Sequence, residues 1–206
     1  MMKENSNNNL LKGAWKEVND NRCVKDTNEN VRISTNITLD EGETLQERIE
    51  KLCSQIVAVL TERNQTLSTV ESLTGGMLSS FICNIPGASK VFKGGFITYW
   101  EELKKSLCNV SQETLKEYTV VSKEVAEEMA SGCKEKTDTD YCVSTTGVAG
   151  PGSDEYGNPI GKLCFALISG KTLYSFEVKL SGNTRQENRE QACFYALNAL
   201  LELIKE

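Results

Sequence analysis

The sequence feature that most constrains the fold is a glycine-rich turn between a short strand and a helix. Residues 66–71 predict a strand, and apolar residues recur with helical spacing over 77–82. The turn between them runs from Glu71 to Gly76 and ends in two glycines. Such a turn leaves backbone N–H groups free at the helix N-terminus, and glycine allows a ligand to approach the backbone closely.

Two interpretations of this turn are open. In the first, Ser72 or Thr74 is simply the N-cap of the helix. In the second, a hydroxyl of the turn is a nucleophile beside a ready-made oxyanion hole. The turn taken alone favours the capped helix start, so the rest of the chain has to decide between the two.

The composition indicates one domain with a tail. The chain has 206 residues, 39% of them hydrophobic, and a net charge of −6. Residues 1–40 are polar and asparagine-rich, so we expect a mostly mobile tail there and one domain over 41–206. The acidic charge argues against nucleic-acid binding, and no apolar run is long enough for a membrane span. Because a signal-peptide core is also missing, we expect a cytoplasmic protein.

The chain contains no histidine, which limits the chemistry that it can perform. A Ser-His-Asp triad, a Cys-His pair and a histidine-ligated metal are all excluded within this chain. The eight cysteines form no Cys-x-x-Cys pair, so we interpret them as reduced core residues. We therefore expect no metal and no cofactor. A hydrolase built from this sequence needs lysine, a carboxylate or tyrosine as its base.

Hydrophobic periodicity and capping residues predict the remaining elements. In chain order they are a stray strand at 31–34, helix 44–64, strand 66–71, helix 74–84, a loop at 85–89, strand 91–100, helix 101–107, a helix from Ser111 to Tyr118, a helix capped by Ser122, strand 140–146, a hairpin of 160–169 with 172–180, and a last helix from Thr184.

This order of elements predicts an α/β fold with three α/β/α layers and a mixed sheet. Helices and strands alternate early and a hairpin comes late, which favours a mixed sheet with helices on both faces. Ligands of such sheets bind outside the carboxyl ends of the strands. Two glycine-rich loops, 71–76 and 147–152, follow strand ends of that kind. We therefore expect a ligand site between them.

Four motifs then point to a known family. They are Glu71-Ser72-x-Thr74-Gly75-Gly76, Pro86-Gly87-x-Ser89, Gly95-Phe96-x-Thr98-Tyr99 with Lys104 five residues further on, and Thr146-Gly147-Val148-Ala149-Gly150-Pro151. Over roughly 44–206 the chain resembles the C-terminal domain of the competence/damage-inducible protein CinA. The resemblance implies an α/β/α domain that deamidates nicotinamide mononucleotide to nicotinate mononucleotide and ammonia. Two-domain members carry a further nucleotide-hydrolysing domain, for which we expect no room here.

The resemblance also implies catalytic roles for Ser72 as nucleophile, Lys104 as base and Tyr99. A lysine activates a serine only when it is neutral, which requires burial or a nearby cation. Without the resemblance, Lys104-Lys105 on a short helix is more typical of a solvated face. Tyr99 alone is more typical of strand packing. The substrate-binding residues that we expect are Thr74, Gly75 and Gly76 as oxyanion donors, and Thr146, Gly147, Ala149 and Gly150 under the nucleotide.

Two arginines at the start of the last helix indicate an anionic partner. Arg185 lies in the first turn, where the helix dipole disfavours a cation, and Arg189 follows four residues later on the same face. Both arginines are at positions that are locally unfavourable for a cation, which indicates that an anionic ligand such as a phosphate compensates them. The alternative is that Glu187 and Glu190 screen both arginines on a solvated surface. We expect a nucleotide as ligand and a homo-oligomer, dimer or higher.

The chain departs from the family pattern at three places. Leu73 stands where a cysteine is common, and 99–104 reads Tyr-Trp-Glu-Glu-Leu-Lys in place of Tyr-Ser-Asn-Glu-Ala-Lys. The start of the last helix, 182–185, carries one residue more than the usual Gly-Asp-Arg spacing. Three functions therefore stay open: an active amidohydrolase, a catalytically weakened nucleotide-binding or regulatory protein, and a serine-lysine hydrolase of another small amide.

Overall fold

The structure, a computed structural model, describes residues 10–12, 32–34 and 37–205. Most of the tail predicted at 1–40 lies outside the described residues, so that boundary stays a prediction. Within it, strand β1 (Leu10–Lys12) pairs antiparallel with strand β2 (Arg32–Ser34), which agrees with the stray strand expected at 31–34.

The main sheet has five strands in the order β4-β3-β5-β6-β7. Their bounds are β3 Leu67–Glu71, β4 Phe92–Ile97, β5 Tyr141–Gly147, β6 Lys162–Ser169 and β7 Thr172–Lys179. Strand β3 runs parallel to β4 and β5, whereas β5, β6 and β7 pair antiparallel. The predicted mixed sheet is confirmed, and β3 lies between the two strands parallel to it.

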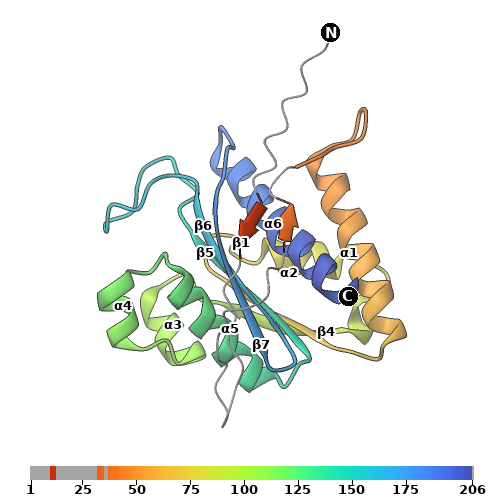
Figure 1. The fold of residues 1–206 in the computed structure, drawn as a ribbon, viewed down its shortest axis with the longest axis horizontal. Coiled ribbons are helices and arrows are strands. Elements are labelled where there is room, and N and C mark those ends of the chain that lie inside the picture. Colours follow the sequence, from red (N-terminus) through yellow and green to blue (C-terminus); the bar gives the residue numbers. More distant parts are fainter. Residues whose placement is uncertain (1–9, 13–31, 35–36, 206) are drawn as a thin grey trace.

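Helices cover both faces of this sheet (Figure 1). One layer holds α1 Leu45–Glu62, α2 Met77–Cys83 and α6 Arg185–Lys205, which share one hydrophobic core with the sheet. The other holds α3 Glu101–Cys108, α4 Gln112–Tyr118 and α5 Lys123–Thr137, which enclose a second core. The three-layer α/β/α prediction is confirmed.

Short-range capping explains where several helices begin. The Thr44 hydroxyl accepts the N–H of Glu47, and the Glu47 carboxylate accepts the N–H of Thr44. Ser111 and Ser122 cap α4 and α5 through their hydroxyl oxygens. Because these bonds satisfy N–H groups that have no partner within the helix, the starts could be predicted from local sequence.

Two predicted boundaries were wrong by three residues. Helix α2 begins at Met77 rather than 74, because Gly75 and Gly76 adopt φ angles of 58° and 93° in the left-handed region. Strand β4 ends at Ile97 rather than 100. The loop expected at 85–89 also contains the start of a short 3₁₀ helix, η1 (Ala88–Lys90).

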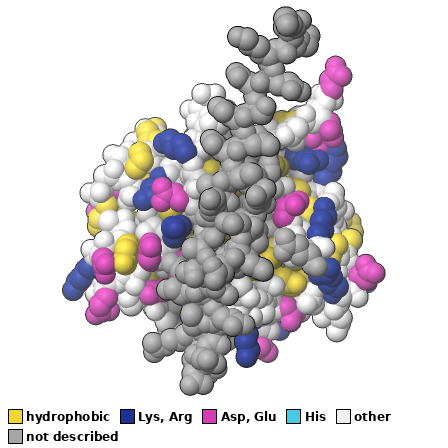
Figure 2. All heavy atoms as spheres, in the orientation of Figure 1, with side chains coloured by type: hydrophobic (Ala, Val, Ile, Leu, Met, Phe, Trp, Pro, Cys, Tyr) yellow, Lys and Arg dark blue, Asp and Glu magenta, His cyan; other side chains and the backbone are white. Residues whose placement is uncertain are grey.

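The face of the molecule drawn in Figure 2 mixes positive and negative side chains, with no large area of one sign. None of the helices in the described part of the chain is long and apolar enough to cross a membrane.

Glu71 fixes the turn that leads from β3 into α2. Its side chain is fully buried, and its carboxylate accepts the N–H groups of Gly76 at 2.9 Å, Leu78 at 3.1 Å and Ser79 at 2.8 Å. The Ser79 hydroxyl donates to it as well. A carboxylate at a helix N-terminus is stabilised by these N–H groups and by the helix dipole. The N-terminus of α2, where an anionic ligand could otherwise bind, is therefore occupied by the Glu71 carboxylate.

We predict that Glu71→Gln lowers the free energy of unfolding by about 2 kcal/mol, because charge-assisted bonds become neutral and an amide N–H₂ faces backbone donors. Urea denaturation of the purified variant measures this effect. Glu202→Gln, on the exposed side of α6, is the control and should change the midpoint little. Equal midpoints for both variants would contradict the stabilising role that we assign to the Glu71 carboxylate in this turn.

Candidate active site

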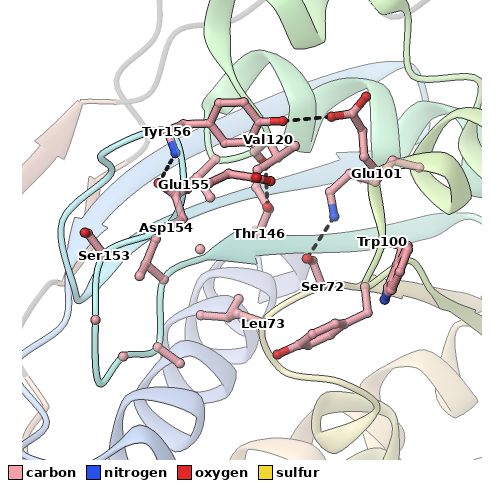
Figure 3. Close-up of a pocket in the computed structure, with 18 of the residues that line it drawn as sticks. Ser72, Leu73, Trp100, Glu101, Val120, Thr146, Ser153, Asp154, Glu155 and Tyr156 are labelled. Carbon is pink, nitrogen blue, oxygen red and sulfur yellow. Dashed lines mark hydrogen bonds between the residues drawn. The ribbon is translucent and has the colours of Figure 1, made fainter.

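A cavity of about 770 Å³ opens at the carboxyl ends of β3 and β5. It is lined by the turn after β3, the start of α3, the loop after β5 and the first residue of α6 (Figure 3). Both glycine-rich loops singled out in the sequence thus contribute to one cavity. It lies where mixed α/β sheets bind their ligands.

Ser72 and Lys104 meet inside this cavity. Ser72 is the first residue after β3, and its N–H donates to the Thr145 carbonyl at 2.9 Å, which ties the turn to β5. The Lys104 Nζ lies 2.8 Å from Ser72 Oγ and donates to the Thr98 carbonyl at 2.7 Å. Although the pair is 32 residues apart in sequence, the β4-to-α3 connection carries Lys104 back to the end of β3.

Lys104 is buried, contrary to the solvated face that its short helix suggested. Only 2% of it is exposed. Burial lowers the pKa of Lys104 from 10.5 to about 8, and the weaker influence of Cys108 and Glu101 acts in the opposite direction. About one lysine in ten is then neutral at pH 7, so this amine can accept a proton.

The backbone N–H groups of the turn divide into used and unused donors. The N–H of Gly75 donates to the Ser72 carbonyl at 3.1 Å, and that of Gly76 to Glu71. In the part of the chain that the structure describes, the N–H groups of Leu73 and Thr74 make no hydrogen bond. The unused donors are thus those directly after the serine. The Thr74 side chain is buried, and its hydroxyl pairs with that of Thr145.

Tyr99 and Arg185 contact each other at the cavity. Tyr99 is half exposed, and the guanidinium of Arg185 donates to its hydroxyl. The same guanidinium donates to the Gly150 carbonyl at 2.5 Å. Arg185 therefore connects the loop after β5 to Tyr99 in the segment before α3, and the remaining guanidinium N–H groups are available to an anion.

The loop after β5 is held against the rest of the site. The Thr146 hydroxyl donates to the Val120 carbonyl at 2.7 Å, and Asn188 of α6 donates to the Ala149 carbonyl at 3.0 Å. A Cβ on Gly147 would lie 2.5 Å from the Lys162 carbonyl oxygen, so only glycine fits there. The residue type at each of these positions is therefore explained by the packing and hydrogen bonds of the loop, in addition to any contact with a ligand.

Four of the expected binding residues are not part of this cavity wall, and one of them, Thr74, is buried. Gly75, Gly76 and Arg189 line a separate depression beside α2. Arg189 donates to the carbonyls of Leu73 at 3.2 Å and Thr74 at 2.6 Å, and so supports the turn from behind. The structure therefore brings Arg185 to the cavity and Arg189 to the turn, although both start from the same side of α6.

Three groups have roles that the sequence alone did not predict, namely the Glu71 carboxylate, the Thr98 carbonyl and the Asn188 side chain. Glu71 carried a signal, because an acidic residue in the turn that leads into a helix is a ready partner for the first N–H groups of that helix. Thr98 acts through its backbone and so leaves no side-chain signal. Asn188 lies 39 residues from its partner and is found only in three dimensions.

Comparison with known proteins identifies the family. The family model of the CinA C-terminal domain matches residues 49–204. A competence-damage inducible protein homologue from Clostridium botulinum (strain Kyoto / Type A2) is 45% identical over 166 residues, which are 80% of this chain and 40% of that protein. A CinA-like protein from Thermotoga neapolitana is 34% identical over 194 residues, covering 86% of this chain and 47% of its own length. The chain thus spans less than half of these curated relatives.

Solved structures agree with this assignment. The crystal structure of a competence-damaged protein (CinA) superfamily protein from Escherichia coli superimposes with a TM-score of 0.74 at 32% identity, over 81% of this chain and 94% of that one. A competence/damage inducible protein from Agrobacterium tumefaciens gives the same TM-score at 29% identity, over 82% and 100% of the two chains. The chain belongs to the CinA C-terminal domain family.

Proposed function

We propose that this chain is an amidohydrolase that deamidates nicotinamide mononucleotide to nicotinate mononucleotide and ammonia. The observation that carries the proposal is the buried Lys104 amine at 2.8 Å from the Ser72 hydroxyl, with a pKa lowered to about 8. Membership of the CinA C-terminal domain family supports the choice of substrate. The absence of histidine fits a serine that is activated by lysine.

In the first half of the reaction, neutral Lys104 accepts the Ser72 proton while Oγ attacks the carboxamide carbon. The developing oxyanion is stabilised by the N–H groups of Leu73 and Thr74, which have no other partner within the described residues. When the C–N bond breaks, the Lys104 ammonium gives its proton to the departing nitrogen. Ammonia leaves, and the nicotinoyl group stays on Ser72 as an ester.

In the second half, water attacks the ester carbon and Lys104 accepts the proton of this water. The C–Oγ bond breaks, Ser72 Oγ takes the proton back, and the carboxylic acid is released. The Thr98 carbonyl, which accepts from Nζ, keeps the amine directed toward Oγ throughout. For the substrate's phosphate we propose Arg185, with the loop of residues 147–150 under the nucleotide.

A second candidate is a nucleotide-binding or regulatory protein with little turnover. It is favoured by the segment from Trp100 to Leu103, which departs from the family pattern and places Trp100 and Glu102 in the cavity wall. The two candidates share the binding of the nucleotide and differ only in the release of ammonia. Ammonia release from nicotinamide mononucleotide therefore separates them.

We predict that Ser72→Ala reduces ammonia release by several orders of magnitude, because the nucleophile is gone. The fold should persist, as judged by circular dichroism and by the unfolding midpoint. Ser54→Ala, on the exposed side of α1, is the matched control and should keep full turnover. Wild-type turnover in the Ser72 variant would show that another group attacks the amide.

We predict that kcat/KM rises about tenfold per pH unit below the lysine pKa and levels off above about 8. The sign follows from the base: protonated Lys104 cannot accept the Ser72 proton, so activity is lost as the pH falls through this pKa. Lys104→Arg keeps a cation that stays protonated and should be inactive at every pH tested. A flat profile from pH 6 to pH 9 (about three units around this pKa) with chemistry rate-limiting would exclude Lys104 as the base.

We predict that Arg185→Ala weakens binding of the nucleotide by about 2 kcal/mol, the scale of a lost charge-assisted contact. Turnover of the phosphate-free nucleoside should barely change. Arg63→Ala, exposed beyond the end of α1, controls for the loss of one positive charge. Equal losses for nucleotide and nucleoside would assign Arg185 a structural role in place of phosphate binding.

A further inference from the structure

Trp100 is a residue whose place in the fold explains neither its size nor its exposure. It is 71% exposed, more than any other large hydrophobic residue in the described part of the chain. It is also the N-cap of α3, and its side chain makes no capping bond. Serine, threonine, aspartate and asparagine are the residues that stabilise this position. Tryptophan thus serves neither the core nor the helix start.

The indole instead lines the active-site cavity. Trp100 and Ser72 both belong to the cavity wall, and in the view of Figure 3 the serine lies between the indole and the loop at 153–156. Lys104 is fixed one helical turn further on, with its N–H donating to the Trp100 carbonyl at 3.3 Å. A ligand whose amide reaches Ser72 therefore shares the cavity with an exposed aromatic surface.

The charge of the cavity wall favours a cation near this surface. Four carboxylates line the cavity, namely Glu101, Glu102, Asp154 and Glu155, against the two basic residues Lys104 and Arg185. Glu101 is engaged by Lys105 at 3.1 Å and by the Tyr156 hydroxyl at 3.1 Å, and Asp154 by Asn158. Within the described residues, Glu102 and Glu155 have no such partner.

We propose that Trp100 is a specificity-determining platform for a positively charged pyridine ring, with the carboxylate of Glu102 in the same cavity wall. The face of an indole attracts cations more strongly than any other aromatic side chain does. The site would then select an N-alkylated, cationic pyridine carboxamide over a neutral ring of the same size and shape. This inference rests on the proposed function for the substrate class, and it adds that the site recognises the positive charge of the ring.

The test compares two probes that differ in ring charge: nicotinamide mononucleotide and its reduced, uncharged dihydro form. The protein is the full chain with Ser72→Ala, so that neither probe is consumed, and with Trp15→Phe, so that Trp100 is the one indole left. Quenching of the indole fluorescence and calorimetry give the two dissociation constants. We expect the cationic probe to bind roughly 3- to 30-fold more tightly, the range of a cation–aromatic contact.

Trp100→Ser and Trp100→Phe, assayed by calorimetry in the same background, separate recognition from folding. Trp100→Ser should remove the preference for the cationic probe and at the same time raise the unfolding midpoint, because serine is a good N-cap. Trp100→Phe should keep part of the preference, since phenylalanine is a weaker cation platform. Tyr118→Ser, which removes an exposed aromatic side chain outside the cavity, should leave the preference unchanged.

Two results would overturn the platform. One is equal affinity for the two probes, and the other is a preference that survives in Trp100→Ser. In the second case, a change of oligomeric state in Trp100→Ser, measured by analytical ultracentrifugation, would assign the indole to a protein contact. Ammonia release is measured separately with the intact Ser72, so failure of the hydrolase proposal and failure of the platform are distinguishable.

Discussion

The structure depends on one costly constraint, the burial of the Lys104 amine beside Ser72. The pKa of this group is about 8 in the fold, against 10.5 ordinarily, because burial disfavours the ammonium. The folded state therefore binds fewer protons than the unfolded chain between these values, and stability rises with pH through that window. Below pH 8 the full cost remains, about 3 kcal/mol for a shift of this size. The two hydrophobic cores have to offset this cost.

The position of the amine is set by close packing on both sides of the sheet. Helix α3, which carries Lys104, lies so close to α5 that a Cβ on Gly132 would meet the Cys108 carbonyl oxygen at 1.9 Å. The serine is fixed from the other side, where Glu71 gathers the first N–H groups of α2. Packing of α3 against α5 thus positions Lys104, and the bonds of Glu71 position the turn that carries Ser72. The two side chains meet at 2.8 Å. Preorganisation of this kind is what the nucleophile and base that we propose would require.

Local signals in the sequence predicted the architecture well, because caps, turns and alternating runs act over a few residues. The capping box at Thr44 is an example. The burial of Lys104 could not be predicted this way, since two adjacent lysines on a short helix are typical of a solvated face, and only the docking of α3 buries one of them. The resemblance to a family, rather than periodicity, singled out Ser72, Lys104 and Tyr99. The roles of Gly76 and Arg189 depend on Glu71 and on the carbonyls of the turn, which are partners that no short motif specifies.

Arg185 connects two parts of the cavity wall, the loop after β5 and the segment before α3. Its guanidinium already donates to the Gly150 carbonyl and to the Tyr99 hydroxyl, and the fork geometry leaves other N–H groups for a ligand. A phosphate bound by these groups would therefore hold Tyr99 and the loop after β5 through the same side chain. Tyr99 is the direct neighbour of Trp100 and lies five residues before Lys104. Binding of a phosphate by Arg185 would thus also order the segment that leads to Lys104, where we propose that the amide reacts. Contacts far from the reacting atoms lower the cost of positioning them in this way.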